Sequence, residues 1–99
     1  AREMGEVLEK LWRGEVVSKE ASKAMMDILL DQRLNGKLPF FIDSMGIDIA
    51  HKTGEDDGIS HDVGVIYTDE PLVVCFVGEH VNVPLYERLM QDAARMLCE

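Results

Sequence analysis

Three groups of side chains in this sequence could carry chemistry: one basic and hydroxyl-bearing tripeptide, three histidines among acidic residues, and two cysteines. The tripeptide Lys52-Thr53-Gly54 lies near the end of a strand-like run. Such a tripeptide arises by chance in about one chain in a hundred of this length, so it needs context before it indicates a function. Neither the histidines nor the aspartates show the spacing of a zinc or calcium site. These residues are His51, His61, His80, Asp56, Asp57 and Asp62. We therefore expect no metal site and no cofactor.

The cysteines and the overall charge exclude further classes of function. Cys75 lies in an apolar run and Cys98 near the chain end, without a CxxC pair, so both are interpreted as small apolar residues. The chain carries 19 acidic and 10 basic residues, a net charge of -9, which repels nucleic acid and anionic membrane surfaces. No apolar run approaches the roughly 20 residues that span a bilayer. We expect neither nucleic acid nor membrane as a partner.

Two amphipathic helices are predicted before the tripeptide. The first runs over residues 4–12 and ends at Gly14, because its apolar residues recur on one helical face. The second begins after the capping residue Ser18, runs to Gln32 and ends at Asn35-Gly36. Its predicted buried face consists of Ala21, Met25, Ile28, Leu29 and Gln32. The segment 37–46 loses this period around Pro39 and is predicted to be a packed loop.

Three runs rich in Val, Ile and Tyr predict strands over residues 47–54, 60–68 and 72–78. The links between them are short enough to force antiparallel neighbours, so a three-stranded meander is expected. The third run is apolar at both odd and even positions, which predicts that both of its faces are covered and that it lies centrally in a larger sheet.

A last helix is predicted after the capping residue Asn82, with Pro84 in its first turn. Its apolar stripe comprises Leu85, Tyr86, Leu89, Met90, Ala93, Met96 and Leu97. This stripe would cover one face of the sheet. Residues 1–99 are thus expected to form a single α+β unit: a three-stranded antiparallel meander with two N-terminal helices and a C-terminal helix packed on the sheet.

These features together resemble the C-terminal part of class A β-lactamase-like, penicillin-recognising serine hydrolases. The tripeptide Lys52-Thr53-Gly54 matches the third signature of that superfamily. The run from Ser60 to Tyr67 resembles its HDVG-type strand, and residues 18–32 with Leu38-Pro39 resemble the helix and loop before it. The final helix also fits, so the resemblance covers nearly all 99 residues.

The resemblance implies a serine acyl-enzyme mechanism on β-lactam or peptidoglycan-like amide bonds. Lys52 would place a positive charge near the substrate carboxylate and the nucleophile, and Thr53 would hydrogen-bond that carboxylate. Gly54 would let the ligand approach the backbone, and the amide of Glu55 would donate to the oxyanion. The family usually carries a small or hydroxyl side chain after the glycine. Glu55 therefore argues against efficient binding of an anionic β-lactam.

The other signatures of the superfamily are missing from these residues. No Ser-x-x-Lys and no Ser-Asp-Asn occurs. The run Asp31-Gln32-Arg33-Leu34-Asn35 imitates the Glu-x-x-Leu-Asn signature, but it directly precedes the Lys-Thr-Gly strand, whereas that signature comes much earlier in the family.

We therefore expect a C-terminal fragment that is inactive alone and whose partner is the missing N-terminal part of the same enzyme. The alternative is a self-standing, non-catalytic binding or interaction module. A longer reading frame upstream carrying Ser-x-x-Lys would favour the fragment, and a native start codon just before Ala1 would favour the module. The family is usually extracytoplasmic.

The resemblance also implies an open sheet edge. In the family, the strand corresponding to residues 72–78 is flanked by a strand from the N-terminus, which these residues do not include. An apolar edge without Lys or internal Pro is a template for pairing with another chain. Self-association of the fragment is therefore expected.

Overall fold

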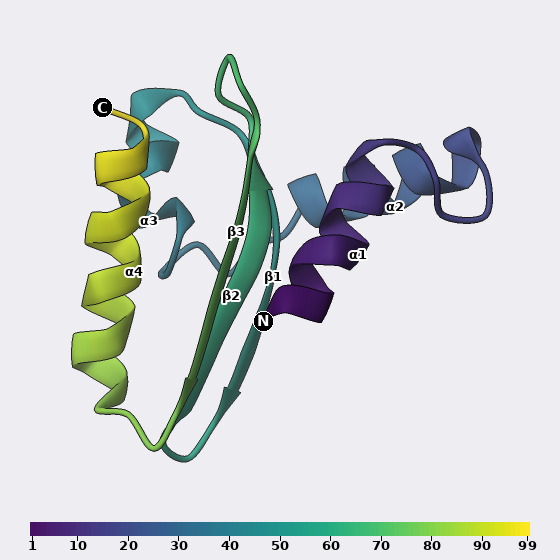
Figure 1. Ribbon diagram of the computed structural model, residues 1–99. Coiled ribbons are helices and arrows are strands. Elements are labelled where there is room, and N and C mark those ends of the chain that lie inside the picture. The colour runs from purple at the N-terminus through teal and green to yellow at the C-terminus, as the bar shows by residue number, and fades with distance from the viewer.

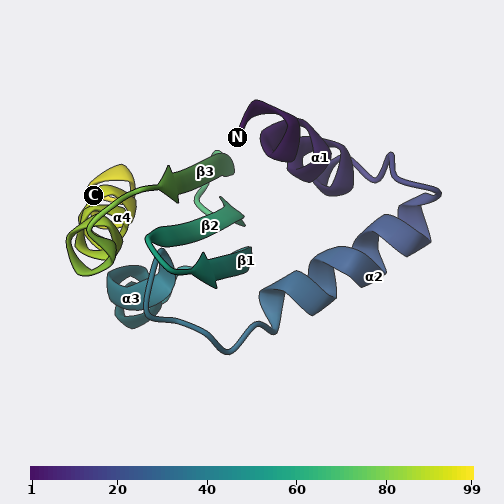
Figure 2. The ribbon, with the colours of Figure 1, turned by 90° about the horizontal axis from the view of Figure 1, so that it is seen from below.

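The computed structural model describes residues 1–99 as three layers, with a small antiparallel sheet in the middle (Figure 1). Two helices lie on one face of the sheet and two on the other, which Figure 2 shows from below. In chain order the elements are α1 (Arg2–Trp12), α2 (Lys19–Leu30), α3 (Pro39–Ile42), the 3-10 turn η1 (Asp43–Met45), β1 (Ile49–Asp56), β2 (Ile59–Ile66), β3 (Leu72–Glu79) and α4 (Val83–Leu97). The predicted α+β meander with flanking helices is confirmed. None of the helices has the length and hydropathy that crossing a bilayer requires.

The predicted start of α2 is confirmed, but its end and its buried face differ. The Ser18 hydroxyl accepts a hydrogen bond from the Ala21 amide at 3.0 Å and caps the helix. The helix ends at Leu30 rather than at Gln32, and Ile28, predicted to be buried, is 63% exposed. The fully buried residues are Ser22 and Met26, while Met25 and Leu29 of the predicted face are partly buried against the same core. The Ser22 hydroxyl bonds both the amide and the carbonyl of Val16.

The predicted loop over residues 37–46 is wrong, because most of it is helical. Pro39 starts the single turn α3, where its missing N–H costs nothing and its fixed φ suits a helix. The 3-10 turn η1 continues the path, and Gly46 at φ 73° ends it. A helix of one turn is too short to show a repeating hydrophobic pattern in the sequence. The segment from Asp31 to Leu38 leads into this turn and passes beside β1, from the α2 face of the sheet to the α3 face (Figure 2).

The strands pair in the order β1-β2-β3, all antiparallel. A two-residue turn joins β1 to β2, and Gly58 occupies it at φ 65°. Within these residues β2 is central and β3 lies at an edge, as the missing neighbouring strand implied, and the central position of the third strand in a larger sheet stays a prediction. Val73 and Val77 of β3 remain 40% and 41% exposed, so its faces are not both covered.

Each face of the sheet has its own hydrophobic core. Under α3 and α4 the buried residues are Leu38, Ile42, Ile49, Ile66, Val74, Met90 and Ala94. Under α1 and α2 they are Leu8, Leu11, Met26, Ala50, Val63 and Val65. Since successive strand residues point to opposite faces, these two cores fix which side chains of β1 face which helices.

Helix α4 covers the sheet with a narrower stripe than predicted. Asn82 caps it as expected, its side chain accepting from the Leu85 amide at 3.3 Å. The ring of Tyr86 lies so close to Gly78 that a Cβ there would meet it at 2.5 Å. Met90 and Ala94 continue this row at intervals of four and are fully buried. The predicted burial of four other stripe residues is wrong, because Leu85, Leu89, Met96 and Leu97 are each half or more exposed.

We predict that the outer edge of β3 makes the 99-residue chain self-associate. This strand pairs only with β2, and its exposed valines add an apolar surface beside unpaired backbone groups. Sedimentation across a concentration series should show dimers or larger species. Val73→Lys should weaken them by placing a charge at the edge, whereas Val7→Lys on α1, at similar exposure, should not. A folded, strictly monomeric chain at high micromolar concentration would contradict the prediction.

Candidate functional site

The Lys-Thr-Gly strand is β1, an edge strand of the sheet. The four predicted site residues are consecutive, so the alternation of the strand divides them between the two faces. Thr53 lies opposite the buried Asp62, on the α4 face, and Glu55 follows on the same side. Lys52 lies opposite Val63, on the face of α1 and α2, and Gly54 shares that side. The structure therefore brings these residues together along one edge and separates them into two pairs.

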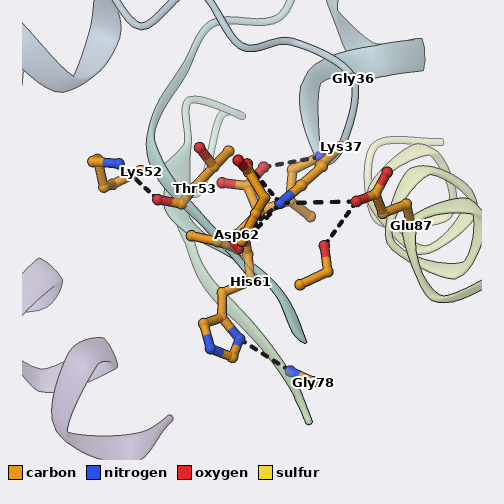
Figure 3. A network of polar contacts seen from close by, with 12 residues as sticks. Gly36, Lys37, Lys52, Thr53, His61, Asp62, Gly78 and Glu87 are labelled. Atoms are coloured by element: carbon orange, nitrogen blue, oxygen red, sulfur yellow. Dashed lines mark hydrogen bonds and ion pairs between the residues drawn. The ribbon is translucent and has the colours of Figure 1, made fainter. Parts of the chain in front are cut away.

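Lys52 is exposed, and its ammonium group donates a hydrogen bond to the carbonyl of Thr53 at 2.6 Å. It forms no ion pair within the chain, so its charge is available to a ligand. Its side chain points away from Lys37 (Figure 3). Gly54 lies against the His61 ring, because a Cβ at this position would be 3.4 Å from His61 Cδ2. The ligand contacts expected of Lys52 and Gly54 stay predictions.

The centre of the polar network is Lys37, which the sequence analysis did not single out (Figure 3). Its ammonium group donates to the carbonyls of Gly54 and His61 at 3.3 and 3.2 Å. It also donates to Glu55 Oε1 at 3.0 Å, and Glu87 Oε2 of α4 lies 3.9 Å away. The Lys37 side chain is only 7% exposed, so this ammonium group is a buried cation held by several oxygen atoms.

A second buried group, Asp62, joins the same segment to the sheet. Its Oδ2 accepts from the Leu38 amide at 3.0 Å, and its Oδ1 lies 2.9 Å from His51 Nδ1. The other ring nitrogen, His51 Nε2, is buried without a hydrogen-bond partner. Asp62 is thus a structural hydrogen-bonding residue. In the same region Ser60 donates to Glu87 Oε2 at 2.9 Å.

The sequence carried no signal for the role of Lys37. It is a single lysine among loop residues, 17 to 24 positions away from its partners in β1 and β2. Only the path of residues 31–38 beside β1 brings these groups together (Figure 2). His51 and Asp62 are likewise 11 positions apart and meet because Thr53 and Asp62 are in register.

The electrostatics of the site centre on Glu55. The hydrogen bond from Lys37, followed by the charge of Lys37, lowers the pKa of Glu55; burial opposes this, and Thr53 and Lys52 act weakly with Lys37. A lowered carboxyl pKa means that the ion pair stabilises the fold above the unfolded pKa and that this contribution is lost as the pH falls through the folded pKa. The contribution is small because the Glu55 side chain is 53% exposed to screening solvent.

A hollow of about 350 Å³ opens beside these groups. It is lined by Arg33, Leu34, Asn35, Gly36, Lys37, Thr53, Glu55 and Glu87, only one of which is apolar. A second hollow of about 410 Å³ lies between α1, α2 and Tyr67, away from the Lys-Thr-Gly strand. A ligand that contacts Thr53 and Glu55 would therefore lie in the polar hollow.

Replacing the buried carboxylate of Asp62 tests whether it holds the Leu38 segment against the sheet. We predict that Asp62→Asn destabilises the chain by about 1–3 kcal/mol, because the amide has one acceptor oxygen where the carboxylate uses two, and His51 could accept from its NH2 group only by carrying a proton on the buried, unpartnered Nε2. Urea unfolding measures the loss. Asp57→Asn in the exposed turn should leave the unfolding midpoint nearly unchanged. Equal midpoints for both variants would show that Asp62 does not hold the segment.

Known proteins of similar sequence and structure share the fold described above. The family model for the Beta-lactamase enzyme family matches residues 1–99. No curated protein sequence matches the chain. Among solved structures, a β-lactamase from Sphaerobacter thermophilus DSM 20745 is 27% identical with a TM-score of 0.85, covering 95% of this chain and 37% of that one. PBP-A is 25% identical with a TM-score of 0.80, covering 97% of this chain and 37% of that one.

A β-lactamase from Chitinophaga pinensis DSM 2588, at 20% identity and a TM-score of 0.75, shares the fold; the match covers 95% of this chain and 38% of that one. The chain thus spans little more than a third of the length of these relatives. The family match over all 99 residues, on a sheet whose edge strand carries Lys52-Thr53-Gly54, shows that this chain belongs to the β-lactamase enzyme family.

Proposed function

We propose that this segment supplies the Lys-Thr-Gly wall of the cleft in a serine β-lactamase-like hydrolase that acts on β-lactam or peptidoglycan-like amide bonds through an acyl-enzyme. The observation that carries the proposal is the position of Lys52 in this chain, which belongs to the family: the side chain is exposed on an edge strand and forms no ion pair within the chain. One of the matched structures, a PBP-A mutant, is an acyl-enzyme complex with penicillin G, which supports the reaction class.

Each residue of the strand has a separate role in this proposal. Lys52 places its positive charge near the attacking hydroxyl. Thr53 presents its hydroxyl to the substrate from the other face of the strand, where it lines the polar hollow. Gly54 leaves the backbone accessible to the substrate, and the Glu55 amide donates to the oxyanion, where such donors are worth about 2.7–4 kcal/mol.

The nucleophile must come from elsewhere, because these residues contain no Ser-x-x-Lys. We propose that the remaining part of the same enzyme is the partner. The exposed apolar side chains of Leu85, Leu89 and Met96 on α4, and the open edge of β3, are surfaces suited to such a partner. A β-lactam or a peptidoglycan-like compound would be the ligand of the assembled cleft.

The 99-residue chain alone is predicted to be inactive. It should neither hydrolyse a chromogenic cephalosporin nor become acylated by a fluorescent penicillin, because an acyl-enzyme needs an activated hydroxyl. Mass spectrometry after incubation detects the adduct directly. Stoichiometric labelling of the chain would contradict the prediction and would locate a nucleophile within these residues.

Within a longer protein that contains this segment and a Ser-x-x-Lys, Lys52→Ala should slow acylation by about 10²–10³-fold, the usual effect of removing one group that stabilises developing charge. Stopped-flow acylation by a penicillin measures the rate. Lys10→Ala, another exposed lysine outside any ion pair, is the matched control. If the two variants acylate equally fast, Lys52 is only a surface lysine and has no part in acylation.

A further inference from the structure

The Glu55 carboxylate lies in a place built to hold an anion. Its Oε1 is 3.0 Å from the ammonium group of Lys37, which is almost fully buried, while Glu55 itself is half exposed. The cation is therefore fixed from behind by the protein, and the carboxylate covers its solvent side. Lys37 cannot turn away, because it is also bonded to the carbonyls of Gly54 and His61.

Neighbouring groups favour a negative charge at the same point. Thr53 and Arg33 line the hollow beside Lys37, and Arg33 forms no ion pair within the chain. Lys37 dominates the lowering of the Glu55 pKa, with Thr53 and Lys52 acting in the same direction. Glu87, at 3.9 Å from the Lys37 ammonium group, opposes a further anion, but its carboxylate is also held by the Ser60 hydroxyl.

A free carboxylate would have to compete with Glu55 for this place. Glu55 is tethered to the site, so its effective concentration there is on the order of millimolar or higher. An incoming anion that did not displace it would lie beside a like charge, which costs free energy at short range. The site as folded is therefore closed to small anions and open to neutral or cationic groups.

We propose that Glu55 is a specificity-determining residue: its carboxylate fills an anion subsite formed by Lys37 and Thr53, so that the cleft excludes a substrate carboxylate and accepts a neutral or cationic group at this point. That the excluded carboxylate belongs to a substrate rests on the proposed function. The anion subsite itself is a property of the 99-residue chain and needs no catalytic serine, so the two can fail separately.

Acetate is the probe, titrated into the isotope-labelled chain at constant ionic strength against chloride. Glu55→Ala should uncover the subsite, because Lys37 keeps two carbonyl acceptors and Glu87 after the change. Saturable shifts of the Thr53 amide and the Lys37 side-chain signals are expected, with a dissociation constant on the order of 10 mM. Glu55→Thr, which suits a strand, should do the same and serves where the alanine variant is poorly folded.

The matched control is Asp56→Ala, which removes the same charge from the next, exposed residue without opening the site. Wild type and this control should show at least tenfold weaker acetate binding than the Glu55 variants. Saturable binding of acetate to the wild type at Thr53 and Lys37 would overturn the proposal. So would a folded Glu55 variant that binds acetate no better than Asp56→Ala does.

Discussion

The buried ammonium group of Lys37 is the interaction on which the rest of the site depends. Removing such a cation from water costs several kcal/mol, and that cost is offset only where oxygen atoms surround it. Here two main-chain carbonyls, Glu55 and, further away, Glu87 surround it, from three different elements of the fold. The residues before α3 are therefore held against β1, β2 and α4 at once, and the hollow beside Thr53 has a fixed cationic wall.

The alternation of a β-strand gives the Lys-Thr-Gly run two chemical sides. Lys52 and Gly54 face the side of α1 and α2, whereas Thr53 and Glu55 face the side of Lys37. A ligand along the edge of β1 would meet both sides at once. Its charge preference then depends on groups that are far apart in sequence, which explains why a three-residue motif does not specify a substrate.

The cores on the two faces are complete near the middle of the sheet and incomplete toward β3. Three strands give α4 a surface only wide enough for the row of Tyr86, Met90 and Ala94. The apolar residues on its flank have no partner in these 99 residues, which is consistent with a chain that spans little more than a third of its structural relatives. The same fact explains why the third strand, apolar at both parities, lies at an edge here.

Several features were determined by local sequence and could be predicted from it. The capping side chains Ser18 and Asn82 bond the amides that their positions require, because a cap acts within one turn. The strand runs and their short links predicted the meander, since a short link permits only antiparallel neighbours. The position of Lys52-Thr53-Gly54 on the first strand, and the family, also followed from the residues and their order.

Only the tertiary structure decided how these parts face one another. The contacts of Lys37 with β1 and β2 join residues 17 to 24 positions apart, and no local pattern records such a distance. The Ser22 hydroxyl of α2 is buried and bonds the amide and the carbonyl of Val16, which the apolar pattern of the helix did not indicate. Glu55 was recognised in sequence as an unusual residue after the glycine, but its pairing with Lys37 depends on the path of the chain around the edge of the sheet. Local sequence determines which segments form helices and strands, whereas burial and charge pairing between distant segments determine the site.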